Sequence, residues 1–287
     1  YFRLTMKKFL FGFLLFFVGT MLCFTTTGCT DRKSAQDSLS IDAMDTDSLS
    51  SDVLERSILE HPMPKAADEL FSDFLFNFMN RKDVQYSRIN FPLPVETNNT
   101  VSKIEKRKWK LDKFFSNMEF YTLMFDNRAQ MSLINDTSVN KATLEKIYLD
   151  KHYVKQYFFE RPRGEWRMTK IRSLPIASTS NASFLTFYSR FVTDSLFQLS
   201  SIASELSFSG PNPDDEFNNI EGNLLPEQFS SFAPPMPKGM MYNIIYDEPK
   251  KGSDTKILLI EGIANGIQSE MVFRRVAGKW KLFKMSM

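Results

Sequence analysis

The chain has 287 residues and a formal net charge of +2, with 36 basic and 34 acidic residues. This length suits two modest domains, and the 28 phenylalanines provide enough apolar material to build cores. Such a balanced charge gives no sign of the concentrated basic face that nucleic-acid binding requires, so we expect no nucleic-acid partner. With only two Cys, both near the N-terminus, and two His, the chain lacks the residues for a disulfide framework, a Cys-based zinc site or a site of three histidines.

Residues 6–28 have the organisation of a signal peptide, with Met6 as the expected start. The Lys7-Lys8 pair precedes an apolar run, Phe9 to Phe24, that is shorter than the roughly twenty residues a membrane-spanning helix needs. Gly28-Cys29 then resembles the lipobox of bacterial lipoproteins, although Thr26 stands where Leu is usual. This pattern predicts lipidation of Cys29 and a lipid-anchored protein of the bacterial cell envelope. An uncleaved signal anchor and an ordinary secreted protein are the alternatives.

Residues 29–64 are rich in Ser and Asp and contain no aromatic residue. A segment of this composition buries little apolar surface, so we expect a flexible tether between the membrane and the folded part.

The first folded segment, residues 65–174, begins with an amphipathic pattern from Ala67 to Phe78. Its apolar residues recur at spacings of three and four, which predicts a helix with Asp68 in its first turn. Strands are predicted at Phe120–Asp126 and at His152–Glu160, the latter leading through a turn at Gly164 into a strand that carries Trp166. Two further segments are less regular: Val95–Lys106 reads as a polar loop, and Thr143–Leu149 fits either a helix or a strand.

Residues 180–287 repeat this pattern, which indicates an internal duplication of one domain. Three phenylalanines of the predicted helix recur at one constant offset, as Phe184, Phe187 and Phe191. The terminal strand also recurs, because Gly164-Glu-Trp166 is matched by Gly278-Lys-Trp280. Tyr121–Asp126 is matched by Tyr242–Asp247 at a larger offset, which places an insertion in the Pro-rich stretch 209–238 of the second copy. Further strands are predicted at 257–263 and 270–275.

The order of a helix, an irregular middle and several strands suggests an α+β fold in which a curved antiparallel sheet wraps a helix. This order resembles the cystatin-like fold of nuclear transport factor 2 relatives. The Phe71-x-x-Phe74-x-x-x-Phe78 stripe, the stretch Gln85–Leu93 and Gly164-Glu-Trp166, together with the leader, resemble domain-of-unknown-function family 4348, lipoproteins of Bacteroidetes. The resemblance implies two tandem domains of this fold. It brings no established activity, so no residue's role can be carried over.

No catalytic or metal-binding motif is present in the sequence, so we expect no catalytic residue, no metal and no cofactor. The repeated polar residues are the candidates for ligand binding: Tyr121 with Asp126, and Tyr242 with Asp247. Either Asp could instead simply form a strand-end turn. Arg88 is a further candidate because Ser201 replaces it in the second copy, so any role tied to Arg88 belongs to the first copy alone.

The absence of a catalytic constellation favours non-catalytic binding of a protein partner or a small ligand, in a cone between helix and sheet or in a groove between the two copies. The alternative is a small-molecule enzyme of the isomerase or hydratase type, which uses a carboxylate in a cone-shaped pocket. A purely structural role at the membrane is a third reading. The membrane itself is an expected partner, through the lipidated Cys29.

Overall fold

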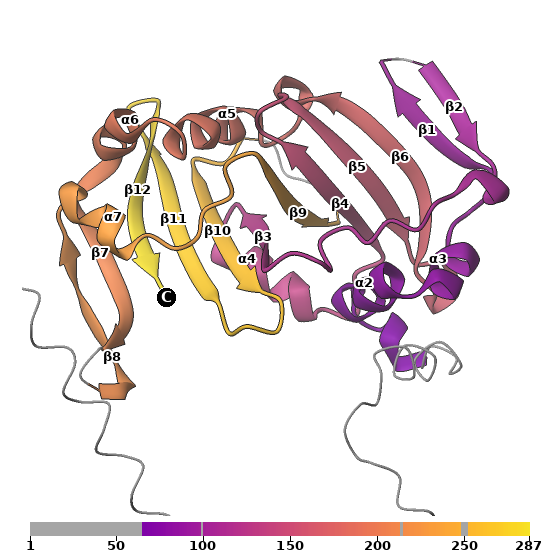
Figure 1. Cartoon of the computed structure of the whole chain (residues 1–287), viewed down its shortest axis with the longest axis horizontal. Coiled ribbons are helices and arrows are strands. Elements are labelled where there is room, and N and C mark those ends of the chain that lie inside the picture. The colour runs from indigo at the N-terminus through magenta and orange to yellow at the C-terminus, as the bar shows by residue number, and fades with distance from the viewer. Residues whose placement is uncertain (1–64, 99, 213–214, 248–251) are drawn as a thin grey trace, which may run out of the picture. The chain divides into compact units, whose positions relative to one another are not determined.

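The computed structural model describes residues 65–98, 100–212, 215–247 and 252–287 (Figure 1). These ranges cover most of the two predicted copies, 65–174 and 180–287. The predicted signal peptide at 6–28, the tether at 29–64 and Cys29 lie outside the described residues.

Each copy begins with two helices and continues with six strands. The first copy contains α2 (Phe71–Asn80), α3 (Lys82–Arg88), β1 (Leu93–Thr97), β2 (Thr100–Ile104), β3 (Phe120–Phe125), α4 (Arg128–Met131), β4 (Lys141–Tyr148), β5 (Tyr153–Glu160) and β6 (Arg167–Pro175). The second contains α5 (Ala182–Phe191), α6 (Ser195–Ser200), β7 (Ile202–Asn212), β8 (Asp215–Leu224), α7 (Phe229–Phe232), β9 (Met240–Tyr246), β10 (Thr255–Gly262), β11 (Gln268–Val276) and β12 (Lys279–Ser286). Short 3₁₀ turns join them at η1 (Lys65–Asp68), η2 (Lys106–Lys108), η3 (Ser132–Asn135), η4 (Pro162–Gly164), η5 (Ile176–Ser178) and η6 (Pro226–Gln228).

The predicted amphipathic helix is confirmed as α2, and its stripe faces the core. Phe71, Phe74 and Phe78 are all almost fully buried, as the spacing of three and four requires. The helix begins four residues later than the pattern suggested, because Lys65–Asp68 forms a 3₁₀ turn. Asp68 therefore lies outside the first turn of α2, and its carboxylate is used elsewhere.

The two copies exchange one strand each, which the sequence did not predict. The sheet orders are β2-β1-β6-β5-β4-β9 and β8-β7-β12-β11-β10-β3. Five strands of each sheet thus come from one copy, in matching order, and the sixth comes from the other copy. The exchanged strands β3 and β9 lie at the centre of the folded part, where the two sheets meet (Figure 1).

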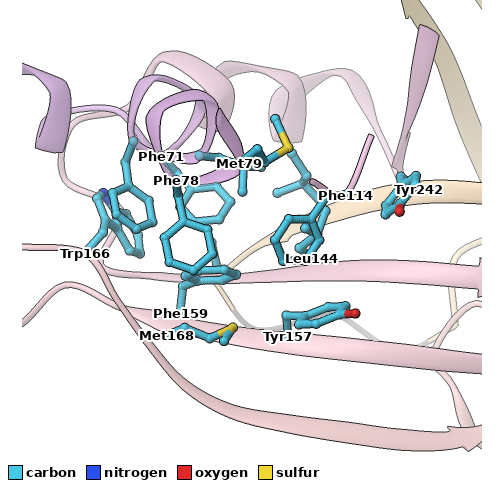
Figure 2. Packing of buried hydrophobic residues seen from close by; sticks show 14 of the residues in the cluster. Phe71, Phe78, Met79, Phe114, Leu144, Tyr157, Phe159, Trp166, Met168 and Tyr242 are labelled. Carbon is cyan, nitrogen blue, oxygen red and sulfur yellow. The ribbon is translucent and has the colours of Figure 1, made fainter. Parts of the chain in front are cut away.

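The two cores repeat each other in detail, which supports the predicted duplication. Trp166 lies 4.9 Å from Phe71 between ring centroids, and Trp280 lies 5.4 Å from Phe184. Phe159 of β5 lies 5.2 Å from Phe71, and the equivalent ring of β11 lies 5.2 Å from Phe184. Edge-to-face contacts of this kind stabilise beyond the area they bury. Figure 2 shows how the α2 phenylalanines fill the space above β5 in the first core, so aromatic side chains and not an open cone occupy that space.

Four predictions need correction or completion. The stretch 95–106 was predicted to be a loop, but it forms most of the β1–β2 hairpin, so that prediction was wrong. The ambiguous segment 143–149 is strand, within β4. The sheets are mainly antiparallel, as expected, but β1 pairs with β6 in parallel and β7 with β12 likewise. The Pro-rich insertion of the second copy begins within a longer hairpin, β7–β8, and β7 accommodates Pro211.

Candidate functional site

A cavity of about 760 Å³ lies where the two copies meet. Its walls come from α2, the segment 111–116, the exchanged strands β3 and β9, and the turn after β10. The cavity therefore depends on the exchange, because β3 brings Tyr121 and Leu123 beside Ile244 and Tyr246 of β9. A volume of this size is typical of pockets that hold small organic ligands.

Apolar side chains form most of the cavity wall. Leu75 and Met79 of α2 and Ile244 of β9 are buried and line it. Phe115 stacks on Tyr121 with ring centroids 4.7 Å apart and meets Tyr242 edge-on at 5.2 Å. A largely apolar cavity with few polar groups is suited to bind an apolar body and to orient it by one or two polar contacts.

The charged residues that line the cavity are all cations: Arg81, Lys82 and Lys113. Arg81 is buried and already paired, since its guanidinium donates to the carboxylate of Asp83, with Nη2 and Oδ2 2.7 Å apart. Lys82 and Lys113 are exposed, and no ion pair of either lysine is found within the described part of the chain. The cavity thus has apolar walls and carries positive charge.

The two predicted Tyr–Asp pairs do not form two equivalent sites. Leu144 of β4 pairs with Ile244, and its counterpart Leu258 of β10 pairs with Met124, so Met124 corresponds to Ile244. The sequence match had aligned Met124 one residue later. A shift of one residue reverses the face on which each side chain lies.

As a result, Tyr121 and Tyr242 meet in one place. Both pack in the core of the first copy and contact the same ring, Phe115. Tyr121 lines the cavity, whereas Tyr242 lies behind Phe115 and is fully buried. The structure therefore joins these two predicted residues in a single aromatic cluster.

The two predicted Asp residues lie apart and have different roles. Asp126 accepts a hydrogen bond from the buried ammonium of Lys256, which also donates to Asn181. These groups line a separate cavity of about 40 Å³, which has room for water but not for a ligand. Asp247 is exposed and has a φ of 57°, so it is a turn residue, as the alternative interpretation held.

Burial perturbs the acidity of groups at the edge of the cavity. The pKa of the Tyr121 hydroxyl is raised mainly by burial and further by the charge of Glu261, its partner on β10. Burial also raises the pKa of Glu261, against a hydrogen bond from Gln268. Burial raises the pKa of Tyr242 to about 12, with the nearby Lys146 opposing the rise. These phenols therefore stay neutral near pH 7 and can serve as hydrogen-bonding groups.

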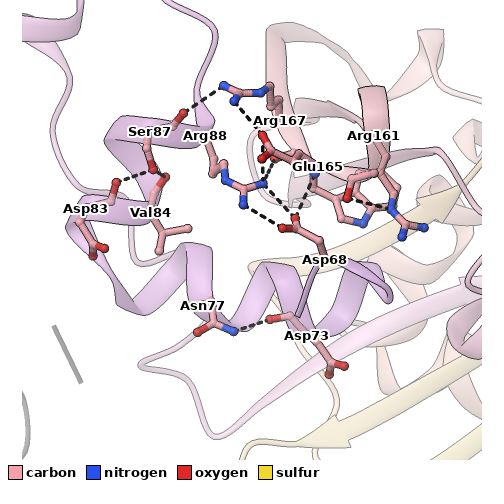
Figure 3. A network of polar contacts seen from close by, with 12 residues as sticks. Asp68, Asp73, Asn77, Asp83, Val84, Ser87, Arg88, Arg161, Glu165 and Arg167 are labelled. Carbon is pink, nitrogen blue, oxygen red and sulfur yellow. Dashed lines mark hydrogen bonds and ion pairs between the residues drawn. The ribbon is translucent and has the colours of Figure 1, made fainter. Parts of the chain in front are cut away.

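Arg88 lies away from the cavity and has a structural partner. Its guanidinium forms two hydrogen bonds with the Asp68 carboxylate, at 3.0 and 2.8 Å, and also donates to the backbone oxygen of Trp166 (Figure 3). Asp68 in turn accepts from the backbone N–H of Trp166 at 3.1 Å. The pair fixes η1 and α3 to Trp166, the residue directly before β6, and its bidentate geometry is the strong form of such contacts.

Sequence reasoning missed one buried polar group, Glu145 of β4. Its carboxylate accepts hydrogen bonds from the side chains of Asn243 and Gln156, both at 2.9 Å. Asn243 also accepts from the backbone N–H of Met124, so the network joins β4 to both exchanged strands. The pKa of Glu145 is raised by burial, against these two hydrogen bonds. The sequence contained little signal of this burial, because Lys146 follows Glu145 directly and the segment 143–149 fitted either a helix or a strand.

Within residues 65–98, 100–212, 215–247 and 252–287, no group of three or more His, Cys, Asp or Glu is placed to hold a metal ion. None of the helices in those ranges combines the length and the apolar character needed to cross a bilayer.

Comparison with known proteins identifies the family. The family model described as "Domain of unknown function (DUF4348)" matches residues 50–287. The crystal structure of an NTF2-like protein from Bacteroides fragilis is similar to this chain, with 37% sequence identity and a TM-score of 0.71. That similarity covers 78% of this chain and 98% of the other. No curated protein matches the chain. The match over most of the chain, the similarity to the Bacteroides protein and the twin helix-and-sheet copies lead to one conclusion: the chain belongs to the DUF4348 family and has an NTF2-like α+β fold.

Proposed function

We propose that this protein is a lipid-anchored lipoprotein of the bacterial cell envelope, and that its folded part binds a small, largely apolar ligand without catalysis. The observation that carries the binding role is the cavity of about 760 Å³ between the copies. The anchor rests on the sequence alone, on the charged and apolar leader followed by Gly28-Cys29. The tether of residues 29–64 would let the cavity operate away from the membrane surface.

The apolar walls give the binding role its physical basis. Leu75, Met79, Phe115 and Ile244 are buried side chains that also line the cavity, so an apolar ligand would contact them without displacing the core. Burial of apolar surface contributes about 25 cal/mol per Å², which is enough for micromolar binding of a ligand of ordinary size.

A neutral, apolar fluorescent dye such as Nile red tests the binding role in the full chain. We expect the dye to bind with a blue-shifted emission, and Ile263→Trp, which adds bulk to the cavity wall, to weaken binding about tenfold or more. Ile220→Trp is the matched control, because Ile220 is exposed on β8 and does not line the cavity. Binding that is equal in both variants and the parent chain would refute the cavity as the site.

Mass spectrometry of the membrane fraction tests the anchor. We expect a mature N-terminus at Cys29 that carries acyl chains, and loss of membrane association in Cys29→Ser. An unmodified Cys29 in a soluble fraction would contradict this part of the proposal and would leave the binding role to be judged by the dye.

A second candidate, acid–base catalysis on a small molecule, is favoured by one observation. Glu261 has a pKa raised by burial and pairs across the strands with Tyr121, which lines the cavity. A carboxylate of this kind could act as a proton acceptor. If turnover is found with any cavity ligand, Glu261→Gln should abolish it while binding is retained; turnover that survives would exclude Glu261.

A further inference from the structure

The chemistry of the cavity indicates more than an apolar ligand. The residues that line it include three cations, Arg81, Lys82 and Lys113, and no Asp or Glu. Only Arg81 is neutralised by a neighbouring carboxylate. An apolar cavity of this kind disfavours a cationic ligand and favours one that carries negative charge at one end.

Lys113 marks where the negative group would lie. It lines the cavity, is exposed and has no ion pair within the described part of the chain. An ammonium group at the edge of an apolar cavity favours an anionic group on a ligand whose apolar part lies inside.

An ammonium group such as that of Lys113 makes charge-assisted hydrogen bonds with a carboxylate, and such bonds are the strong ones. Lys82, at the start of α3, adds a further positive charge at the cavity.

We propose that the ligand is an amphipathic carboxylate of the fatty-acid type. Its hydrocarbon chain would lie against Leu75, Met79 and Ile244, and its carboxylate would pair with Lys113. This inference rests on the proposed binding role and specifies the class of ligand. It involves no covalent step.

Three probes of equal chain length test which class of ligand the cavity prefers, separately from whether it binds any ligand. Dodecanoate, dodecanol and dodecylamine, each below its micelle concentration, are titrated into the full chain by calorimetry. We expect dodecanoate to bind about tenfold or more tightly than dodecanol, and dodecylamine to bind weakest. The preference for dodecanoate should decrease at high salt, because Lys113 is exposed.

Variants locate the carboxylate. Lys113→Met should reduce the preference for dodecanoate over dodecanol several-fold, while dodecanol itself binds as before. Lys103→Met is the matched control, because Lys103 is exposed on β2 and does not line the cavity. Dodecanol or dodecylamine binding as tightly as dodecanoate would overturn the inference yet leave the cavity a binding site. Failure of all three probes together with Nile red would instead refute the proposed function.

Discussion

At the scale of single residues, the two copies share the phenylalanines of their first helix but differ in their polar contacts. Asp68 and Arg88 form a bidentate pair in the first copy, and the same offset places Asn181 and Ser201 in the second. Gln85 binds the backbone of Asp112 and the Trp109 ring nitrogen, whereas its repeat in the second copy binds the carbonyl of Phe191. A shared offset therefore identifies equivalent positions but not equivalent hydrogen bonds.

The Asp68–Arg88 pair provides a test of this divergence. Asp68→Asn should lower the free energy of unfolding by about 2–4 kcal/mol, because Arg88 then keeps its charge in a mostly buried place without a counter-charge. Adding Arg88→Ser, which copies the residues of the second copy, should recover part of that loss. Denaturant titration of the four chains of this double-mutant cycle measures the coupling. Additive effects of the two substitutions would show that the pair contributes no coupling.

At the scale of elements, apolar periodicity predicted the first α-helix of each copy and several of the strands, while pairing partners could not be predicted. The stripe of α2 and the alternation of β5 are local patterns, so they are visible in the sequence. The β1–β2 hairpin was missed because β2 is exposed almost throughout and carries no apolar alternation. The exchange of β3 and β9 was missed because each is an apolar strand that fits either sheet. The sequence match also aligned β3 and β9 one residue away from their structural correspondence, because two apolar strands can be matched in more than one register.

The buried Glu145 ties the exchanged strand β9 to β4, and its acidity gives a testable pH dependence. Its pKa is raised in the folded protein above the ordinary value of 4.5, so the folded state holds this proton more tightly than the unfolded chain. Its contribution to stability is therefore fully present below about pH 4.5 and is lost as the pH rises through the folded-state pKa.

Glu145→Gln removes this titration. We expect the difference in unfolding free energy between the parent chain and Glu145→Gln to shift in favour of the variant as the pH rises above about 4.5. Denaturant titrations at several pH values measure that difference. Glu261→Gln should show a change of the same sign, since burial also raises the pKa of Glu261. A difference that does not change with pH would contradict the assignment.

At the scale of the whole molecule, the exchange makes each copy part of the other's sheet. The candidate cavity is a product of this arrangement, since β3 and β9 both line it. It could not be predicted from the sequence, because its wall brings together residues as far apart as Ser72 and Ala264. The sequence did identify one lining residue, because Tyr121 was a predicted site residue. The cations Lys82 and Lys113 belong to no recognisable motif, so they were not predicted.

Because of the exchange, we expect the two copies to unfold in one cooperative transition. Phe74→Ala should destabilise by about 3–5 kcal/mol, since Phe74 is fully buried in the first core. Hydrogen exchange should then show reduced protection in β11 and β12 of the second copy as well as in β5. Loss of protection confined to the first copy, or two separate thermal transitions, would show that the copies unfold independently.

The exchange of β3 and β9 also restricts how the gene for this protein can be rearranged in evolution. Neither repeat is an independent module, because removing one leaves the other with an open sheet edge where its sixth strand should be. Recombination that transplants a single repeat into another protein would therefore yield an incomplete and aggregation-prone fold. We expect the two copies to be inherited as one unit. Their polar residues can diverge, but neither copy can complete its sheet without the strand that the other supplies.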